Sequence, residues 1–137
     1  MRAALSLMLS VLALGGLAAC VLPGVRAEPT GAQDFTSLCA GCHGASGRGD
    51  GSLANNLSPQ SADLTRLSAR NGGAFPGTRV MSKIWGYAGG NDATSAMPAF
   101  ADLVDGDLVP FDGGDGIMTP TPVRLVQLAE YLRSIQG

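Results

Sequence analysis

The sequence predicts an all-α domain of about four helices joined by long, glycine-rich loops. Apolar side chains recur at helical spacing near both ends of residues 30–137. No segment alternates apolar and polar side chains with period two, so the pattern predicts no strand. The chain has 20 glycines among its 137 residues, and long glycine-rich loops are unusual in a compact domain unless they wrap something or carry function.

The N-terminal segment has the pattern of an export signal that precedes the domain. Arg2 supplies one positive charge, a long apolar run follows, and small residues come before Pro23. This run is too short and too weakly flanked for a membrane span, so it indicates secretion. We therefore divide the chain into a leader at 1–20, a tether at 21–29 and one domain at 30–137.

The leader has two candidate processing sites. Leu17-Ala18-Ala19-Cys20 resembles the lipobox of bacterial lipoproteins, in which the cysteine is lipidated and becomes the first mature residue. Ordinary cleavage after Ala27 is the alternative, because Val25-Arg26-Ala27 has small or apolar residues at the two required positions. Cys39 and Cys42 form a pair, which leaves Cys20 odd, and lipidation explains an odd cysteine in an exported protein. We therefore expect a lipid-anchored protein on the periplasmic side of a bacterial membrane, or a soluble periplasmic protein if cleavage follows Ala27.

The domain is expected to begin with a helix that ends at Gly44. Thr30-Gly31-Ala32-Gln33 has the Thr-x-x-Gln form of a capping box, in which two side chains bond the free amides of a helix start. Apolar or sulfur side chains then recur at the spacing of one helix face, at Phe35, Leu38, Cys39 and Cys42. Both cysteines are therefore expected to face the core.

The last helix is expected to start at Thr121-Pro122, a cap followed by proline in the first turn. Its helical spacing is carried by four apolar residues, Leu125, Leu128, Leu132 and Ile135, with Tyr131 beside them. Two shorter helices are expected, one at 61–70 ended by 71–73 and one at 78–85 ended by Gly86. These segments complete the predicted helices.

The segment Cys39-Ala40-Gly41-Cys42-His43 has the Cys-x-x-Cys-His signature by which c-type haem is attached. The two cysteines lie about one helical turn apart, so both can form thioethers to the vinyl groups on one porphyrin edge. His43 then projects under the ring and can bind iron through one nitrogen, while a backbone carbonyl holds the other N–H. The motif therefore predicts one covalently bound haem c.

Zinc binding and dithiol chemistry are the other uses of a Cys-x-x-Cys pair. A closed zinc site needs four ligands, and after export the chain offers Cys39, Cys42 and its single histidine, His43. Dithiol chemistry normally comes with a strand followed by a helix, whereas this motif follows the start of a helix. Both uses fit the residues less well than haem does.

The sixth iron ligand of an electron carrier is expected to be methionine, because a soft thioether favours ferrous iron and raises the potential. Met97 lies in a loop that Pro98 stiffens, far enough along the chain from His43 to reach the opposite haem face. Met118, in a loop before the last helix, is the second candidate. Met81 has the spacing of a core residue on a predicted helix. Met97 is the predicted ligand, and the other two stay open.

Together these segments resemble the class I cytochrome c family. The resemblance rests on Gly31 and Phe35 ahead of the Cys-x-x-Cys-His motif, on Met97-Pro98-Ala99-Phe100, and on Glu130-Tyr131-Leu132-Arg133. It covers nearly all of the mature chain and implies a cytochrome c-like bundle that wraps one haem. It also implies that Gly31 and Phe35 pack near Tyr131, and that Pro59 supplies the carbonyl for the His43 N–H.

The segment 102–122 is long for that family and carries five aspartates, Asp102, Asp105, Asp107, Asp112 and Asp115. We expect a solvated loop. A docking surface for a basic partner is a second interpretation. A weak calcium site is a third, which the spacing disfavours because it departs from that of an EF-hand.

These features indicate an electron-transfer protein rather than an enzyme. The formal net charge is −2 and no basic stripe is present, so nucleic acid is not an expected partner. The expected partners are redox proteins, such as a reductase, an oxidase or a dehydrogenase, which dock through a small transient contact. One alternative is a haem sensor or peroxidase-like enzyme with an open or labile sixth site. Another is a dedicated electron-accepting subunit of a periplasmic dehydrogenase.

Overall fold

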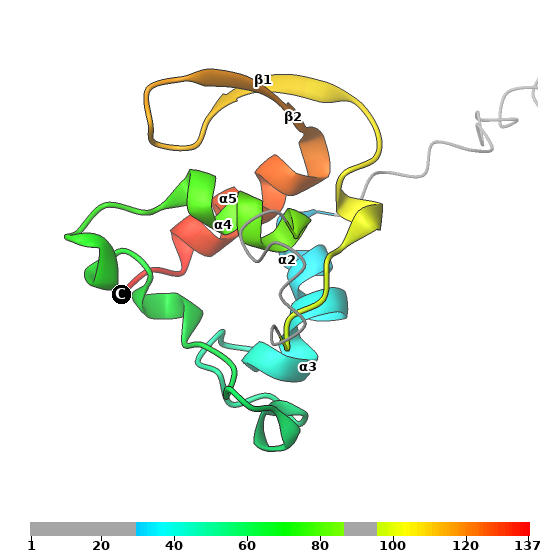
Figure 1. The fold of residues 1–137 in the computed structure, drawn as a ribbon, viewed down its shortest axis with the longest axis vertical. Coiled ribbons are helices and arrows are strands. Elements are labelled where there is room, and N and C mark those ends of the chain that lie inside the picture. The colour runs from blue at the N-terminus through cyan, green and yellow to red at the C-terminus, as the bar shows by residue number, and fades with distance from the viewer. Residues whose placement is uncertain (1–29, 87–95) are drawn as a thin grey trace, which may run out of the picture.

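The computed structural model describes residues 30–86 and 96–137, which Figure 1 shows as a ribbon. In that view a two-stranded hairpin lies at the top, α4 and α5 lie below it, and α3 lies lower still, above the loop that follows it. The leader, the tether and Cys20 lie outside the described residues. None of the helices in the described part is long and apolar enough to cross a bilayer.

The first helix is continuous and consists of α2 (Gly31–Asp34), a π-helical turn (Phe35–Cys39) and α3 (Ala40–His43). Its start is the predicted capping box. The Gln33 N–H donates to the Thr30 hydroxyl at 3.3 Å, and the Thr30 N–H donates to Gln33 Oε1 at 2.8 Å. Gly44 ends the helix with a positive φ of 79°. The predicted helix, its cap and its end are confirmed.

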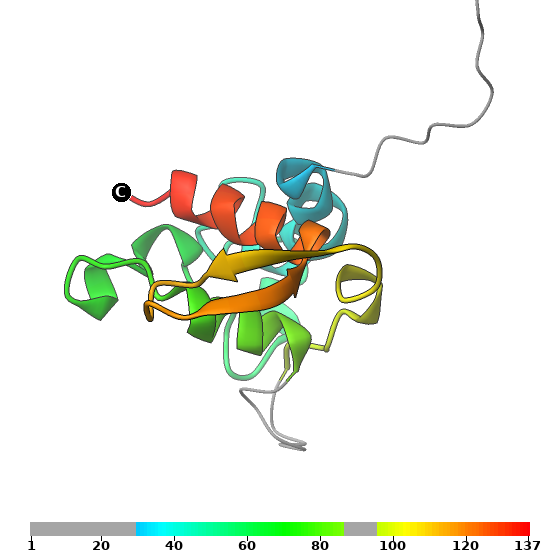
Figure 2. The ribbon, with the colours of Figure 1, turned by 90° about the horizontal axis from the view of Figure 1, so that it is seen from above.

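The last helix, α5 (Val123–Ser134), crosses α2 at very short range (Figure 2). A β-carbon built on Gly31 would lie 2.0 Å from the carbonyl oxygen of Gln127, so glycine permits an approach that alanine would prevent. Beside the crossing, the ring centroids of Phe35 and Tyr131 lie 5.2 Å apart, a favourable separation for an aromatic pair. The expected packing between the first and last helices is confirmed. The helix starts one residue later than predicted, because Pro122 is its cap.

The helix predicted at 61–70 is correct only in part, since the region forms two separate 3-10 turns, Leu64–Arg66 and Ala69–Asn71, and not one continuous helix. Gln136 Nε2 donates to the carbonyl of Leu64 at 2.8 Å, and Gln136 Oε1 accepts the N–H of Ser68 at 2.8 Å. In an α-helix this carbonyl and this N–H would bond each other, so the Gln136 amide takes the place of a helical bond. The helix predicted at 78–85 is confirmed as α4 (Gly77–Trp85).

Residues 108–122 form an antiparallel hairpin, so the all-α prediction is wrong for this segment, and part of the expected loop is a sheet. β1 (Leu108–Asp112) pairs with β2 (Met118–Pro122), and Pro110 lies opposite Pro120 in the register. Proline lacks an N–H and weakens the pattern by which a strand is predicted. The hairpin lies across α4 and α5 (Figure 2), and its turn is bonded to α4 through the Thr78 N–H and the Gly113 carbonyl at 3.1 Å.

The side chain of Asp112 closes the hairpin turn. Its Oδ1 accepts the N–H groups of Gly114, Gly116 and Asp115 at 2.8, 3.0 and 3.1 Å. These bonds, that of Gly114 first, hold the pKa of the Asp112 carboxyl below its usual value. Because the pKa is lowered by folding, the carboxylate stabilises the turn above its ordinary pKa, and this contribution is lost as the pH falls through the lowered pKa.

We therefore expect the amide signals of Gly114 and Gly116 to shift together in an NMR titration, below the usual pH range of an aspartate. Asp112→Asn should abolish this transition, because asparagine has no carboxyl group to titrate. Asp105→Asn, at an aspartate before the hairpin, should retain it. Amide signals that move in the usual aspartate range, or that still move in Asp112→Asn, would contradict the role of Asp112.

One buried cluster, here called the core cluster, joins the helices. Its members are Phe35, Cys39, Val80, Ile84, Leu103, Leu125, Leu128 and Leu132. Half-buried residues, including Met97 and Phe100, pack against it. The first cysteine of the motif and the segment around Met97 therefore border the same core.

Candidate functional site

The Cys-x-x-Cys-His motif forms the C-terminal end of the first helix (Figure 1). Cys39 is 8% exposed and belongs to the core cluster, whereas Cys42 and His43 are half-buried. The π-helical turn Phe35–Cys39 includes the first cysteine of the motif, and at its end the Ala40 N–H donates to the carbonyl of Phe35, one residue further back than in an α-helix. The extra residue in this turn shifts the positions after it, including Cys42, off the stripe that α-helical spacing predicts. The expectation that both cysteines face the core is therefore correct for Cys39 and only partly correct for Cys42.

His43 is oriented by a backbone carbonyl. Its Nδ1 lies 2.9 Å from the carbonyl oxygen of Ala62, and because a carbonyl can only accept, Nδ1 carries the proton. In the neutral imidazole, Nε2 is then the nitrogen without a proton, and this nitrogen can bind a metal ion. The expectation that Pro59 supplies this carbonyl is wrong. Pro59 is exposed, and Ala62, later in the same loop, reaches the ring.

The loop after the motif bonds the end of its helix. The N–H groups of Gly49, Gly51 and Leu53 donate to the carbonyls of His43, Cys42 and Gly41 at 2.8, 3.2 and 2.9 Å. The last carbonyls of a helix have no partner within it, so this loop satisfies them and holds the motif in place. A β-carbon on Gly51 would lie 2.4 Å from the carbonyl oxygen of Gly41. The sequence indicates only a glycine-rich loop here and carries no signal for these contacts.

The three candidate methionines lie in different environments. Met97 is half-buried and packs against the core cluster. Met118 is 63% exposed on β2, where it lies opposite Asp112 in the hairpin register. Met81 is half-buried on α4 and also packs against the core cluster. Met97 and Met81 therefore border the core, while Met118 lies on the exposed hairpin.

The thiols and their surroundings argue against the two alternative uses of the motif. Burial, with smaller contributions from Asp34 and Cys42, raises the pKa of the Cys39 thiol to about 11. A reactive dithiol needs a lowered thiol pKa and benefits from a helix N-terminus, whereas this motif ends its helix. Within residues 30–86 and 96–137, no three side chains of His, Cys, Asp or Glu gather as they would around a metal ion. A structural zinc ion would need four such ligands.

Comparison of the chain with known protein families distinguishes haem attachment from zinc binding and dithiol chemistry. The cytochrome c family model matches residues 29–136. The chain belongs to the cytochrome c family. No curated protein and no solved structure gave a match. Membership of the family implies covalently bound haem c and a haem-based role in electron transfer.

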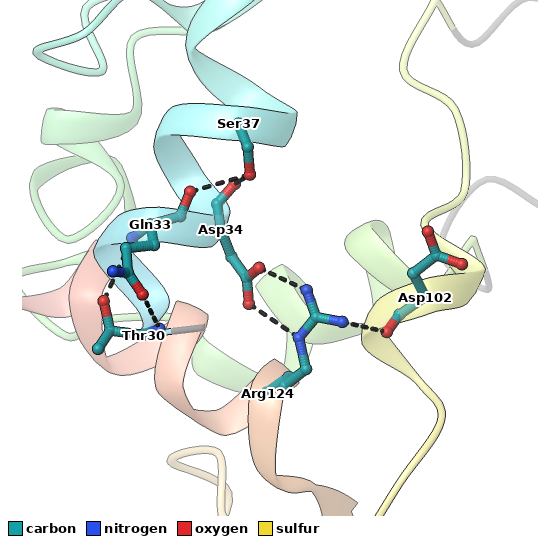
Figure 3. Close-up of polar contacts among 6 residues, drawn as sticks. All are labelled: Thr30, Gln33, Asp34, Ser37, Asp102 and Arg124. Atoms are coloured by element: carbon teal, nitrogen blue, oxygen red, sulfur yellow. Dashed lines mark hydrogen bonds and ion pairs between the residues drawn. The ribbon is translucent and has the colours of Figure 1, made fainter. Parts of the chain in front are cut away.

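This cytochrome c also contains a buried ion pair that the helical spacing does not predict. Asp34 is 1% exposed on the first helix and pairs with Arg124 at the start of α5 (Figure 3). A signal was present in the sequence, because Asp34 lies between Gly31 and Phe35, and a buried aspartate needs a partner. The sequence does not say which of the arginines is that partner.

Proposed function

We propose that this cytochrome c is a periplasmic electron carrier with a single haem, whose iron is bound between His43 and Met97. The observation that carries the proposal is the bond from His43 Nδ1 to the Ala62 carbonyl, which leaves Nε2 for iron. Cys39 and Cys42, on the same helix end, are the thiols for covalent attachment. When bound, the haem supplies an iron that takes up and gives off one electron. The residues present therefore fit the group that the family implies.

Two features support Met97 as the second axial ligand. It is half-buried against the core cluster to which Cys39 belongs, whereas Met118 is exposed on the hairpin. The chain beside it is anchored, because the Phe100 N–H donates to the carbonyl of Ile84 at 3.2 Å. A thioether in this position would favour ferrous iron and raise the reduction potential, as an electron carrier requires.

Membrane attachment is part of the same proposal and rests on the leader and the lipobox-like segment ending at Cys20. Lipidation there would leave residues 21–29 as a tether, and a flexible chain of that length spans about 15–18 Å. Such a tether would restrict the domain to redox partners in or on the same membrane. Cleavage after Ala27 would instead release a soluble periplasmic carrier.

The first test is the optical spectrum of the oxidised holoprotein, compared with Met97→Ala and Met118→Ala. Methionine bound to ferric haem gives a weak far-red charge-transfer band. We expect the wild type and Met118→Ala to show this band and Met97→Ala to lose it. The potential of Met97→Ala should also fall by about 0.1 V or more, since axial ligands set haem potentials over roughly 0.8 V.

Each other outcome has a definite meaning. A wild type without the band, which binds cyanide readily, would favour the haem sensor or enzyme with an open sixth site. Loss of the band in Met118→Ala alone would identify Met118, on the hairpin, as the sixth ligand. The intact mass of the same preparation should show one haem and an acylated N-terminus at Cys20. A chain that starts at Glu28 without lipid would indicate cleavage after Ala27.

A further inference from the structure

The guanidinium of Arg124 joins three segments of the chain (Figure 3). Its Nε and Nη2 donate to the two carboxylate oxygens of Asp34 at 3.2 and 2.5 Å. Its Nη1 donates to the backbone carbonyl of Asp102 at 2.9 Å. One planar group therefore binds a side chain of the first helix and the backbone of a distant turn at the same time.

The two bound segments are those that carry the proposed axial ligands. Asp34 lies on the continuous helix that ends at His43. Asp102 lies in the 3-10 turn Ala101–Leu103, which follows Met97 in the chain. We call residues 96–104 the Met97 segment. Arg124 thus connects the helix of one proposed ligand to the segment of the other.

The Met97 segment is attached to the core by packing of Met97 and Phe100, by burial of Leu103 and by hydrogen bonds. Leu103 is fully buried in the core cluster, and the Phe100 N–H donates to the Ile84 carbonyl at 3.2 Å. Ala101 and Asp102 are exposed. The bond from Arg124 to the Asp102 carbonyl therefore holds the exposed turn between the half-buried Phe100 and the buried Leu103.

The position of Arg124 is unusual for a cation. It lies in the first turn of α5, where the helix dipole disfavours positive charge. Asp34 offsets this effect, and Arg124 in turn satisfies a buried carboxylate that would be costly alone. A buried ion pair adds little net stability compared with a well-packed apolar pair. The ion pair instead contributes geometry, because the planar guanidinium of arginine holds its hydrogen-bond acceptors at fixed positions in one plane.

We propose that Arg124, oriented by Asp34, is a positioning residue that fixes the Met97 segment relative to the helix carrying His43. This inference rests on the proposed ligation of iron by Met97. The bond from Arg124 to the Asp102 carbonyl keeps the Met97 segment against the core. Loss of that bond would let the Met97 segment move away, and a bound haem iron would then be open to other ligands.

The test uses two variants of the holoprotein. Arg124→Lys keeps a charge for Asp34 but cannot form the planar fork. The double variant Asp34→Asn/Arg124→Gln removes both charges and leaves no buried ion unpaired. Arg133→Gln is the matched control, because Arg133 lies at the other end of α5 in an exposed pair with Glu130.

Three measurements are made at a temperature where circular dichroism shows every variant to be folded. They are hydrogen exchange of the Met97 segment, the far-red band, and the rate at which imidazole binds ferric haem. In both test variants we expect exchange in residues 96–104 and imidazole binding to be faster by about tenfold, the effect of losing one hydrogen bond to a charged group. The far-red band should weaken. Hydrogen exchange in α5, apart from Arg124 itself, should be unchanged. Arg133→Gln should match the wild type in all three.

A purely structural ion pair would give a different result. The test variants would then unfold at lower denaturant concentration but show wild-type exchange and imidazole binding while folded, which would overturn the inference. A wild type that lacks the far-red band would overturn the Met97 ligation itself. Hydrogen exchange would still decide whether Arg124 holds residues 96–104, so the two failures are distinguishable.

Discussion

Replacing Gly31 by alanine should destabilise the folded protein by about 3 kcal/mol or more. The new β-carbon would lie 2.0 Å from the carbonyl oxygen of Gln127 and 2.9 Å from the nitrogen of Leu128. Both atoms belong to the backbone of α5, so no side-chain rotation relieves the overlap. The two helices must separate, which also opens the contact between Phe35 and Tyr131. Denaturant unfolding of the holoprotein, followed by circular dichroism, measures the loss.

Gly41→Ala is the matched control for this variant. Gly41 lies on the same continuous helix, and the nearest atom to its β-carbon would be a methyl carbon of Leu53 at 3.5 Å, an ordinary contact. Alanine here should be neutral or should stabilise the protein by up to about 1 kcal/mol, because it is the better helix former. Equal losses in the two variants would contradict the steric explanation.

Replacing Gly51 by alanine should reduce both the stability of the protein and its content of attached haem. The β-carbon would lie 2.4 Å from the carbonyl oxygen of Gly41 and 2.7 Å from that of Ala40, both in the backbone of the motif. The loop must move away and lose the bonds by which its N–H groups cap the helix at Cys42 and His43. We expect a loss of about 3 kcal/mol, together with a lower ratio of haem to polypeptide in the purified protein.

Gly72→Ala separates this packing effect from the general cost of replacing a loop glycine. Gly72 has a positive φ of 67°, and no atom lies within 4 Å of its β-carbon position. Alanine there should cost only the strain of the left-handed conformation, about 1–2 kcal/mol, with normal haem content. A Gly51→Ala protein with normal haem content and the same stability as Gly72→Ala would show that the loop does not need its close contact with the motif.

The sequence by itself determined the features that depend on residues close together in the chain. The capping box at Thr30, the helix end at Gly86 and the spacing of α5 are local patterns, and the structure confirms each of them. The Cys-x-x-Cys-His motif is local as well, and the family match agrees with the haem protein that it predicts. The contact between Phe35 and Tyr131 was expected from the family resemblance, not from spacing. Ligation by Met97 and lipidation of Cys20 stay predictions.

Only the tertiary structure decided which distant groups meet. It selected Ala62 rather than Pro59 as the acceptor for His43, and it paired Asp34 with Arg124. It also placed the amide of Gln136 where a helical bond was expected, and it paired two proline-containing strands. The physical reason is the same in each case. Apolar spacing specifies which face of a segment is buried, but every residue has a backbone carbonyl, and which carbonyl or charge lies opposite depends on how the whole core packs.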